Sequence, residues 1–144
     1  MINVDGKIEE LKKKCSDMNM RLTPQRIEVL KMIAGTTSHP DADMVYSKVK
    51  EIMPTISLDT VYRTLTSLED LGLIFKVDNQ LPKARYDADL RPHCHFICVK
   101  CGSVHDIFIE NIIEAPKESF NYGEVLQTNI QVKGICNKCL HSNK

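Results

Sequence analysis

The stretch from residue 93 to residue 101 reads His93-Cys94-His95-Phe96-Ile97-Cys98-Val99-Lys100-Cys101, and a second Cys-x-x-Cys pair, Cys136 and Cys139, follows near the end of the chain. Two such pairs can supply four thiolates, which close a tetrahedral shell around zinc and leave no open position for a substrate. The alternatives are two disulfides, or small buried apolar residues. The two-residue spacers favour metal, and we expect a structural Zn(II) site on Cys98, Cys101, Cys136 and Cys139.

Outside this quartet, the chain has the features of an intracellular protein. Its first residues lack the apolar stretch and small-residue cleavage site of a signal peptide. No apolar run reaches the roughly 18 residues of a membrane span. Cys15 and Cys94 remain as free thiols, which suits a reducing compartment. We expect a cytoplasmic protein without a membrane partner.

Charge and size limit the function further. The 144 residues carry 19 basic and 19 acidic side chains, so a strongly basic DNA-binding surface is absent. A DNA-binding role would need a few well-placed cations and a dimer. A C-terminal part of roughly 55 residues would bury little core and would need its zinc to fold.

The N-terminal part predicts four helices with recognisable ends. Apolar residues recur at helical spacing in residues 6–19, 23–35, 41–52 and 57–71. Thr23, Asp41 and Ser57 are suited to cap the second, third and fourth helices, and Pro24 suits a first helical position.

Two strands should follow these helices, at residues 73–77 and 83–87, with a turn at 78–82 between them. Helices followed by a basic hairpin make the order of a winged-helix domain, here residues 1–86. The helix at 57–71 would then enter the major groove of DNA. On it, Ser57 and Thr60 could bind phosphate or base edges, Tyr62 a thymine methyl or phosphate, and Arg63 guanine or phosphate.

The remainder predicts a small α/β domain, so that the whole chain is α+β. Strands are expected at 96–99, 104–109 and 125–132, with a helix at 111–120. A sheet with too little chain to cover its apolar face is a surface for self-association. We therefore expect a homodimer.

A second group of residues could bind metal through nitrogen and oxygen. Alternate residues of a strand share a face, so His93 and His95 would lie side by side, with Asp106 on the neighbouring strand. Asp87 lies where the two halves join, and His39 precedes Pro40 in the N-terminal half. Such a set without thiolates suits Fe(II), Mn(II), Co(II) or Zn(II).

Together these segments resemble a known family. The run Ser57-Leu58-Asp59-Thr60-Val61-Tyr62-Arg63-Thr64-Leu65, the segment His93-x-His95-x-x-Cys98-x-x-Cys101-Gly102 and the closing Cys136-x-x-Cys139 are similar to the ferric-uptake-regulator (Fur) superfamily of bacterial metal-dependent repressors. The resemblance implies a winged-helix DNA-binding domain, a hinge at 87–92, and a dimerisation and metal-sensing domain at 93–144 that holds the structural zinc. It also implies a homodimer on a palindromic double-stranded operator.

The regulatory ligands that the resemblance implies are His39, Asp87, His93, His95 and Asp106. They match the peroxide-stress branch, in which Fe(II) or Mn(II) is bound and Fe(II) leads to oxidation of a ligand histidine, His39 or His93. Iron-uptake regulators commonly have Glu at the positions of Asp87 and Asp106. An iron- or manganese-responsive uptake regulator is the alternative within the family.

Two departures from the family pattern stand out. Cys94, between the two histidines, is not part of it, and the segment 127–129 lacks the histidine of a further metal site. We expect no complete third site. An enzyme is not expected, because the chain lacks the His-x-Glu and Pro-Cys-x-x-Cys signature of zinc deaminases and its four-thiolate site is closed. A zinc-stapled interaction module without DNA binding is the other alternative.

Overall fold

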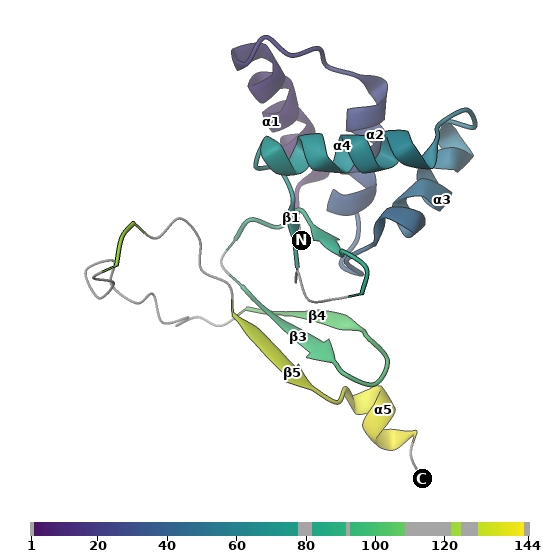
Figure 1. Ribbon diagram of the computed structural model, residues 1–144, viewed down its shortest axis with the longest axis vertical. Coiled ribbons are helices and arrows are strands. Elements are labelled where there is room, and N and C mark those ends of the chain that lie inside the picture. Colours follow the sequence, from purple (N-terminus) through teal and green to yellow (C-terminus); the bar gives the residue numbers. More distant parts are fainter. Residues whose placement is uncertain (1, 78–81, 92, 109–121, 125–129, 143–144) are drawn as a thin grey trace. The chain divides into compact units, whose positions relative to one another are not determined.

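The computed structural model of the chain describes residues 2–77, 82–91, 93–108, 122–124 and 130–142. The chain divides into two units, Met1–Leu90 and Arg91–Lys144. Within the described residues, the first unit contains four helices and a short hairpin, and the second contains a three-stranded sheet and a short helix (Figure 1). This is the expected α+β class. The functional limits 1–86, 87–92 and 93–144 stay a prediction.

The four helices of the first unit begin at side-chain caps. Thr23 Oγ1 accepts a hydrogen bond from the Arg26 amide at 3.3 Å, Asp41 Oδ1 from Met44 at 2.8 Å, and Ser57 Oγ from Thr60 at 3.1 Å. These bonds satisfy amides that have no partner within their own helix. The helices are α1 (Val4–Asp17), α2 (Pro24–Ala34), α3 (Ala42–Ile52) and α4 (Leu58–Asp70).

The first helix begins earlier than predicted. Asn3 caps it by accepting a hydrogen bond from the Gly6 amide at 3.1 Å, so α1 starts at Val4 rather than at Gly6. Val4, four residues before Ile8, packs partly buried against the core and is the first residue of the apolar stripe, so the Asn3 cap and this stripe together place the start of the helix at Val4.

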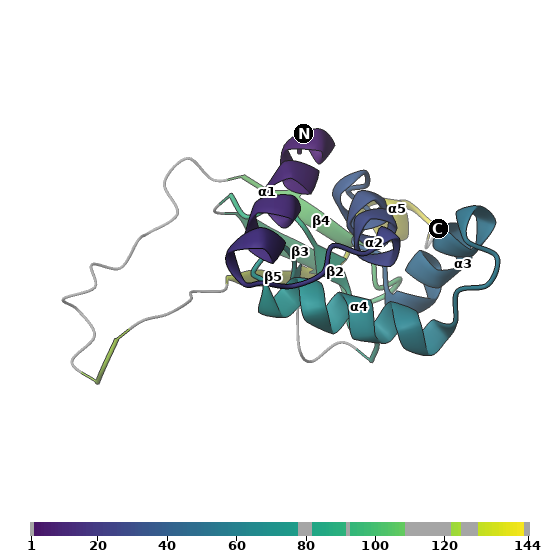
Figure 2. The same cartoon turned by 90° about the horizontal axis from the view of Figure 1, so that it is seen from above.

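Helix α2 is the centre of the first unit. It packs against α1, α3 and α4, and Figures 1 and 2 show α4 running past it with α1 and α3 towards the two ends of α4. The apolar stripe of each helix faces this centre, where Leu11, Leu30, Val49 and Leu65 are fully buried. The packing leaves the opposite side of α4 exposed.

The end of α4 is bound by groups from α1. Gly72 follows the helix with a φ of +72°, and the Leu73 amide donates to the Leu68 carbonyl at 3.0 Å, which is the pattern of a Schellman motif. Lys14 Nζ donates to the Leu71 carbonyl at 2.6 Å and Lys7 Nζ to the Leu73 carbonyl at 3.4 Å. Burial lowers the pKa of Lys7. Two lysines of α1 thus complete the hydrogen bonding at the C-terminus of α4.

The hairpin is shorter than predicted. Strand β1 (Phe75–Lys76) pairs antiparallel with β2 (Tyr86–Asp87), and residues 78–81 of the predicted turn lie outside the described residues. The segment around β2 also contacts the loop before α3. Asp41 and Arg85 form an antiparallel bridge, and the Tyr86 amide donates to the Pro40 carbonyl at 3.0 Å.

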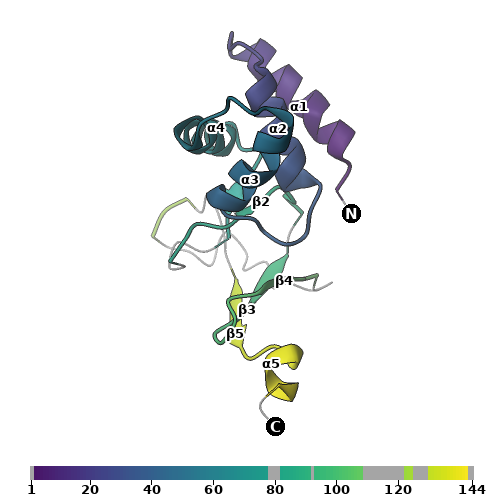
Figure 3. The ribbon, with the colours of Figure 1, turned by 90° about the vertical axis from the view of Figure 1, so that its right-hand side faces the viewer.

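The second unit is a sheet in the order β4-β3-β5, shown with its short helix in Figure 3. Strand β3 (Cys94–Cys98) pairs antiparallel with β4 (Val104–Ile107) and parallel with β5 (Gln131–Gly134), and helix α5 (Asn137–His141) follows β5. Strand β5 extends beyond the predicted end at Val132. The predicted helix at 111–120 and residues 125–129 of the predicted strand lie outside the described residues.

The described part of the chain contains no helix with the length and hydropathy required to cross a lipid bilayer.

Replacing the cap of α4 should destabilise the first unit. We expect Ser57→Ala to lower the free energy of unfolding by about 1 kcal/mol, because the Thr60 amide loses its acceptor. Thr66→Ala is the matched control, since Thr66 is exposed in the middle of the same helix and alanine favours helix. Urea unfolding followed by circular dichroism measures both changes. Equal stability of Ser57→Ala and the wild type would contradict the capping role.

Candidate metal centres

The four predicted zinc ligands lie at one edge of the sheet in the second unit. Strands β3 and β5 are parallel with Cys98 opposite Gly134. Their C-terminal ends therefore meet, and Cys136 lies two residues beyond β5 at the same edge as Cys98. The four sulfur atoms of Cys98, Cys101, Cys136 and Cys139 all lie within 4.8 Å of one another.

The first cysteine pair is shaped by a tight turn between β3 and β4. The Gly102 amide donates to the Cys98 carbonyl at 2.9 Å, and the Cys98 amide donates to the Ser103 carbonyl at 2.9 Å. Gly102 has a φ of +74°, a conformation that glycine adopts without strain. The turn brings Cys101 back towards the end of β3. The second pair is carried by the start of α5, whose N-cap is Cys136.

The distances fit zinc better than disulfides. Cys101 Sγ and Cys136 Sγ are 3.8 Å apart, whereas a disulfide requires about 2.05 Å. A tetrahedral zinc ion with Zn–S bonds of about 2.3 Å separates its sulfur ligands by about 3.8 Å. All six cysteines are free thiols. The donor set and its spacing are suited to Zn(II) in a closed, structural site.

Hydrogen bonds prepare part of this cluster for metal binding. The Cys136 amide donates to Cys98 Sγ at 3.3 Å and, as the largest cause, lowers the pKa of Cys98 to about 6. The side chain of Ser103 lowers the pKa of Cys101. Cys139 differs, because its hydrogen bond with Cys136 raises its pKa to about 12. A divalent cation would offset the negative charge that four close thiolates accumulate.

Substitution within the quartet should remove the zinc. Cys101→Ser is expected to lose the one zinc ion per chain and the folded sheet, because a small unit gains its stability from the metal. Cys94→Ala is the matched control, since Cys94 is a buried cysteine of the same unit outside the cluster. Metal analysis and near-ultraviolet circular dichroism measure the two effects. Retention of a full zinc equivalent in Cys101→Ser would overturn the assignment.

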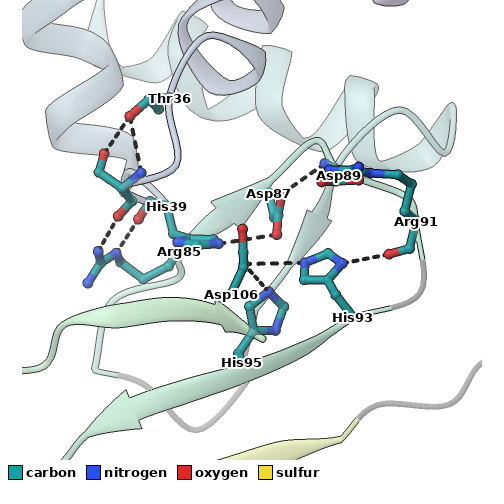
Figure 4. A network of polar contacts seen from close by, with 10 residues as sticks. Thr36, His39, Arg85, Asp87, Asp89, Arg91, His93, His95 and Asp106 are labelled. Atoms are coloured by element: carbon teal, nitrogen blue, oxygen red, sulfur yellow. Dashed lines mark hydrogen bonds and ion pairs between the residues drawn. The ribbon is translucent and has the colours of Figure 1, made fainter. Parts of the chain in front are cut away.

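The first unit brings two of the predicted regulatory ligands together. His39 Nε2 lies 3.2 Å from Asp87 Oδ2, and the other carboxylate oxygen, Oδ1, accepts a hydrogen bond from the Asp89 amide at 2.8 Å. The Asp89 amide thus fixes the Asp87 carboxylate, and the second carboxylate oxygen is directed at the His39 imidazole (Figure 4). His39 has a φ of +54°, a left-handed conformation that non-glycine residues adopt rarely.

The second unit brings the other three together. His95 and Asp106 are opposite each other in the β3–β4 ladder, and His93 lies two residues before His95 on the same face. Both His93 Nε2 and His95 Nε2 lie 3.4 Å from Asp106 Oδ1, and the two imidazole rings have centroids 4.6 Å apart. Two imidazole nitrogens therefore converge on one carboxylate oxygen, as Figure 4 shows.

A neighbouring carbonyl selects the tautomer of His93. Its Nδ1 lies 2.6 Å from the Arg91 carbonyl, so Nδ1 carries the proton and Nε2 keeps a lone pair for a metal. The Phe108 ring stacks on this imidazole with ring centroids 5.2 Å apart. The Arg91 guanidinium lies over the Phe108 ring, with its central carbon 4.7 Å from the ring centroid. These contacts hold His93 in place.

Each half of the regulatory set fits a first-row divalent metal. The separations of 3.2–3.4 Å between donor atoms are close to the ligand spacing around an ion with bonds of about 2.1 Å. Imidazole and carboxylate donors suit Fe(II), Mn(II) or Zn(II). Cys94 takes no part, because alternation along β3 places it on the face opposite His95, where it is buried. Residues 127–129, expected to lack a third-site ligand, lie outside the described residues.

The predicted DNA-binding residues lie at the start of α4. Ser57 and Thr60 bond to each other, with Ser57 Oγ and Thr60 Oγ1 2.9 Å apart. Tyr62 is exposed, and Arg63 Nε lies 2.9 Å from Asp59 Oδ2 in an exposed ion pair one turn apart. Their contact with DNA stays a prediction. Arg85 and Phe108, which contact His39 and His93, were missed by the sequence analysis because no motif includes them.

A helical unit with a hairpin wing, together with a sheet unit that carries a four-cysteine cluster, defines a class of metal-dependent transcriptional regulators. Residues 17–133 match the Ferric uptake regulator family, and the chain belongs to that family. It is therefore a regulator rather than an enzyme, as expected. Regulators of this family bind DNA operators as dimers.

Individual relatives agree with this assignment. The peroxide-responsive repressor PerR of Staphylococcus epidermidis is 27% identical over 139 residues, which cover 95% of this chain and 93% of that protein. The Campylobacter jejuni peroxide stress regulator is 29% identical with a TM-score of 0.69, covering 92% of this chain and 98% of that one. The Helicobacter pylori ferric uptake regulator shares the fold, with a TM-score of 0.81 at 20% identity over 99% of this chain and 97% of that one.

Proposed function

We propose that this protein is a peroxide-sensing repressor that binds DNA while its regulatory site holds metal. The observation that carries the proposal is the pair of preformed half-sites, His39 with Asp87 and His93 with His95 and Asp106, which contain only imidazole and short carboxylate donors. The structural Zn(II) of the cysteine quartet maintains the sheet that carries the second half-site. The regulatory metal is Fe(II) or Mn(II).

The aspartates favour the peroxide branch over iron uptake. Asp87 and Asp106 occupy positions at which the resemblance implies Glu in iron-uptake regulators. The similarity to the peroxide-responsive repressor of Staphylococcus epidermidis, at 27% identity over 139 residues, also supports this branch.

One metal ion bound by both half-sites would join the two units. His39 and Asp87 belong to the unit that carries α4, and the other three ligands belong to the sheet unit. Binding by all five residues therefore favours one relative placement of the units over others. A 100-fold preference for that placement corresponds to about 2.7 kcal/mol. In a homodimer this placement would present two α4 helices to successive major grooves of a palindromic operator.

The response to peroxide depends on the histidines. Fe(II) bound by these histidines and aspartates would supply the redox chemistry that activates hydrogen peroxide next to the imidazoles. One ligand histidine, His39 or His93, would be oxidised: one oxygen atom of the peroxide enters its imidazole in place of a C–H hydrogen, and the other oxygen leaves as water. An oxidised imidazole no longer offers the same lone pair. The five-residue set loses a donor, the units separate, and repression of oxidative-stress genes ends. With Mn(II), which is not oxidised in this way, the repressor should stay bound to its operator in the presence of peroxide.

The test is binding to operator-length DNA by protein loaded anaerobically with Fe(II) or Mn(II), before and after a small excess of peroxide. We expect release of the Fe(II) form alone. Peptides containing His39 or His93 should gain the mass of one oxygen atom. Asp106→Ala serves as the metal-site control and should lose the metal-dependent part of binding.

Other outcomes identify the alternatives. If the Fe(II)-loaded and Mn(II)-loaded proteins both stay bound to the operator after peroxide, and operator affinity depends on the metal concentration, the protein is an iron- or manganese-responsive uptake regulator. If the protein does not bind duplex DNA, or if its binding does not weaken as the salt concentration rises, the alternative of a zinc-stapled interaction module is favoured.

Opposite changes at one ion pair of α4 test the DNA surface. Arg63→Ala should weaken operator binding by about 1–3 kcal/mol if the guanidinium reaches a base or phosphate. Asp59→Asn should leave binding equal or tighter, because Arg63 loses the carboxylate that competes for it. Fluorescence anisotropy at two salt concentrations measures both. If both variants bind like the wild type, Arg63 is not a DNA contact.

A further inference from the structure

Arg85 contacts the backbone of the loop that carries His39. Its Nη2 donates to the Ser38 carbonyl at 2.6 Å, and its Nε donates to the carbonyl of His39 itself. Figure 4 shows the guanidinium against this loop, on the side away from Thr36. The Ser38 amide donates to Thr36 Oγ1 at 3.1 Å. The loop is thus bound by the Arg85 side chain, which precedes β2, and by the hydroxyl group of its own residue Thr36.

The two acceptors of Arg85 flank the α-carbon of His39. Their relative direction is set by the φ and ψ angles of that one residue. In an extended chain successive carbonyls point to opposite sides, and only a helical conformation points them the same way. One guanidinium that binds both carbonyls therefore requires a helical conformation at His39.

The following residue decides which helical conformation this is. Pro40 disfavours the right-handed region for the residue before it, and the observed φ of His39 is +54°. Tyr86 and Asp87, which follow Arg85, bind the same loop through the Pro40 carbonyl and the His39 ring. Residues 85–87 thus bind the backbone carbonyls of residues 38–40, and Asp87 also contacts the imidazole of His39.

We propose that Arg85 is a positioning residue for the regulatory metal: by binding the carbonyls of Ser38 and His39, it keeps His39 in the left-handed conformation that directs Nε2 to Asp87. The inference rests on the proposed function of His39 as a metal ligand. Arg85 does not touch the ion and acts through His39. Lysine cannot replace it fully, because an ammonium lacks the planar fork that binds two carbonyls at once.

The test compares charge-matched variants of the full-length protein in its zinc-containing form. Arg85→Gln removes the guanidinium. Lys83→Gln removes a positive charge two residues away, where Lys83 Nζ lies 2.9 Å from Asp43 Oδ2. We expect Arg85→Gln to weaken Mn(II) binding about 10- to 100-fold, as the loss of a group that orients a metal ligand does. Lys83→Gln should stay within about twofold, and Arg85→Lys should lie between them.

A double-mutant cycle separates positioning from a general loss of structure. In the His39→Ala background, Arg85→Gln should weaken Mn(II) binding by less than about twofold, because the residue through which it acts is gone. Full additivity of the two losses, or equal losses in Arg85→Gln and Lys83→Gln, would overturn the inference. If Arg85→Gln is too unstable to purify, the cycle is run with Arg85→Lys.

A metal-free readout completes the test. The backbone carbon chemical shifts of His39 in the zinc-containing protein without regulatory metal should leave left-handed values in Arg85→Gln and keep them in Lys83→Gln. Unchanged shifts would contradict the role of Arg85. Failure of the proposed function looks different, because the wild type and His39→Ala would then bind Mn(II) equally.

Discussion

The parallel pairing of β3 with β5 is the interaction on which the second unit depends. The two cysteine pairs are far apart in sequence, and only strands that run in the same direction bring their ends to one edge. An antiparallel β5 would place Cys136 at the opposite end from Cys98. Close packing supports this register, since a side chain at Gly134 would come within 2.9 Å of the Phe96 ring. The parallel pairing of this small sheet therefore brings the four cysteines of the cluster together.

Strand β3 also links the two candidate metal centres. Cys98 ends the strand, and His95 lies within it, opposite Asp106. A shift of β3 by one residue against β4 would turn His95 to the other face and break its approach to Asp106. The turn at Gly102 sets that register from the end that carries Cys98 and Cys101, so the four-cysteine cluster and the group of His93, His95 and Asp106 depend on the same register. Both candidate metal centres therefore take ligands from β3, Cys98 for one and His95 for the other.

Local chemistry made much of the fold predictable. Thr23, Asp41 and Ser57 cap helices where expected, because capping depends on neighbouring amides alone. The approach of His93 and His95 to Asp106 followed from strand alternation and a short connection. The contact between His39 and Asp87 could not be derived in this way, since it depends on an isolated bridge between Asp41 and Arg85 and on a left-handed backbone at His39. The family resemblance, rather than spacing, indicated that pair.

The lysines of α1 give the N-terminal helix a role that the family match does not cover, because that match begins at residue 17. Lys7 and Lys14 donate to carbonyls at the end of α4, and Lys7 does so while buried. Any opening of α1 would leave those carbonyls without these donors, so fraying at the end of α4 is coupled to detachment of α1. The two helices behave as one cooperative folding element, although they lie at opposite ends of the helical sequence.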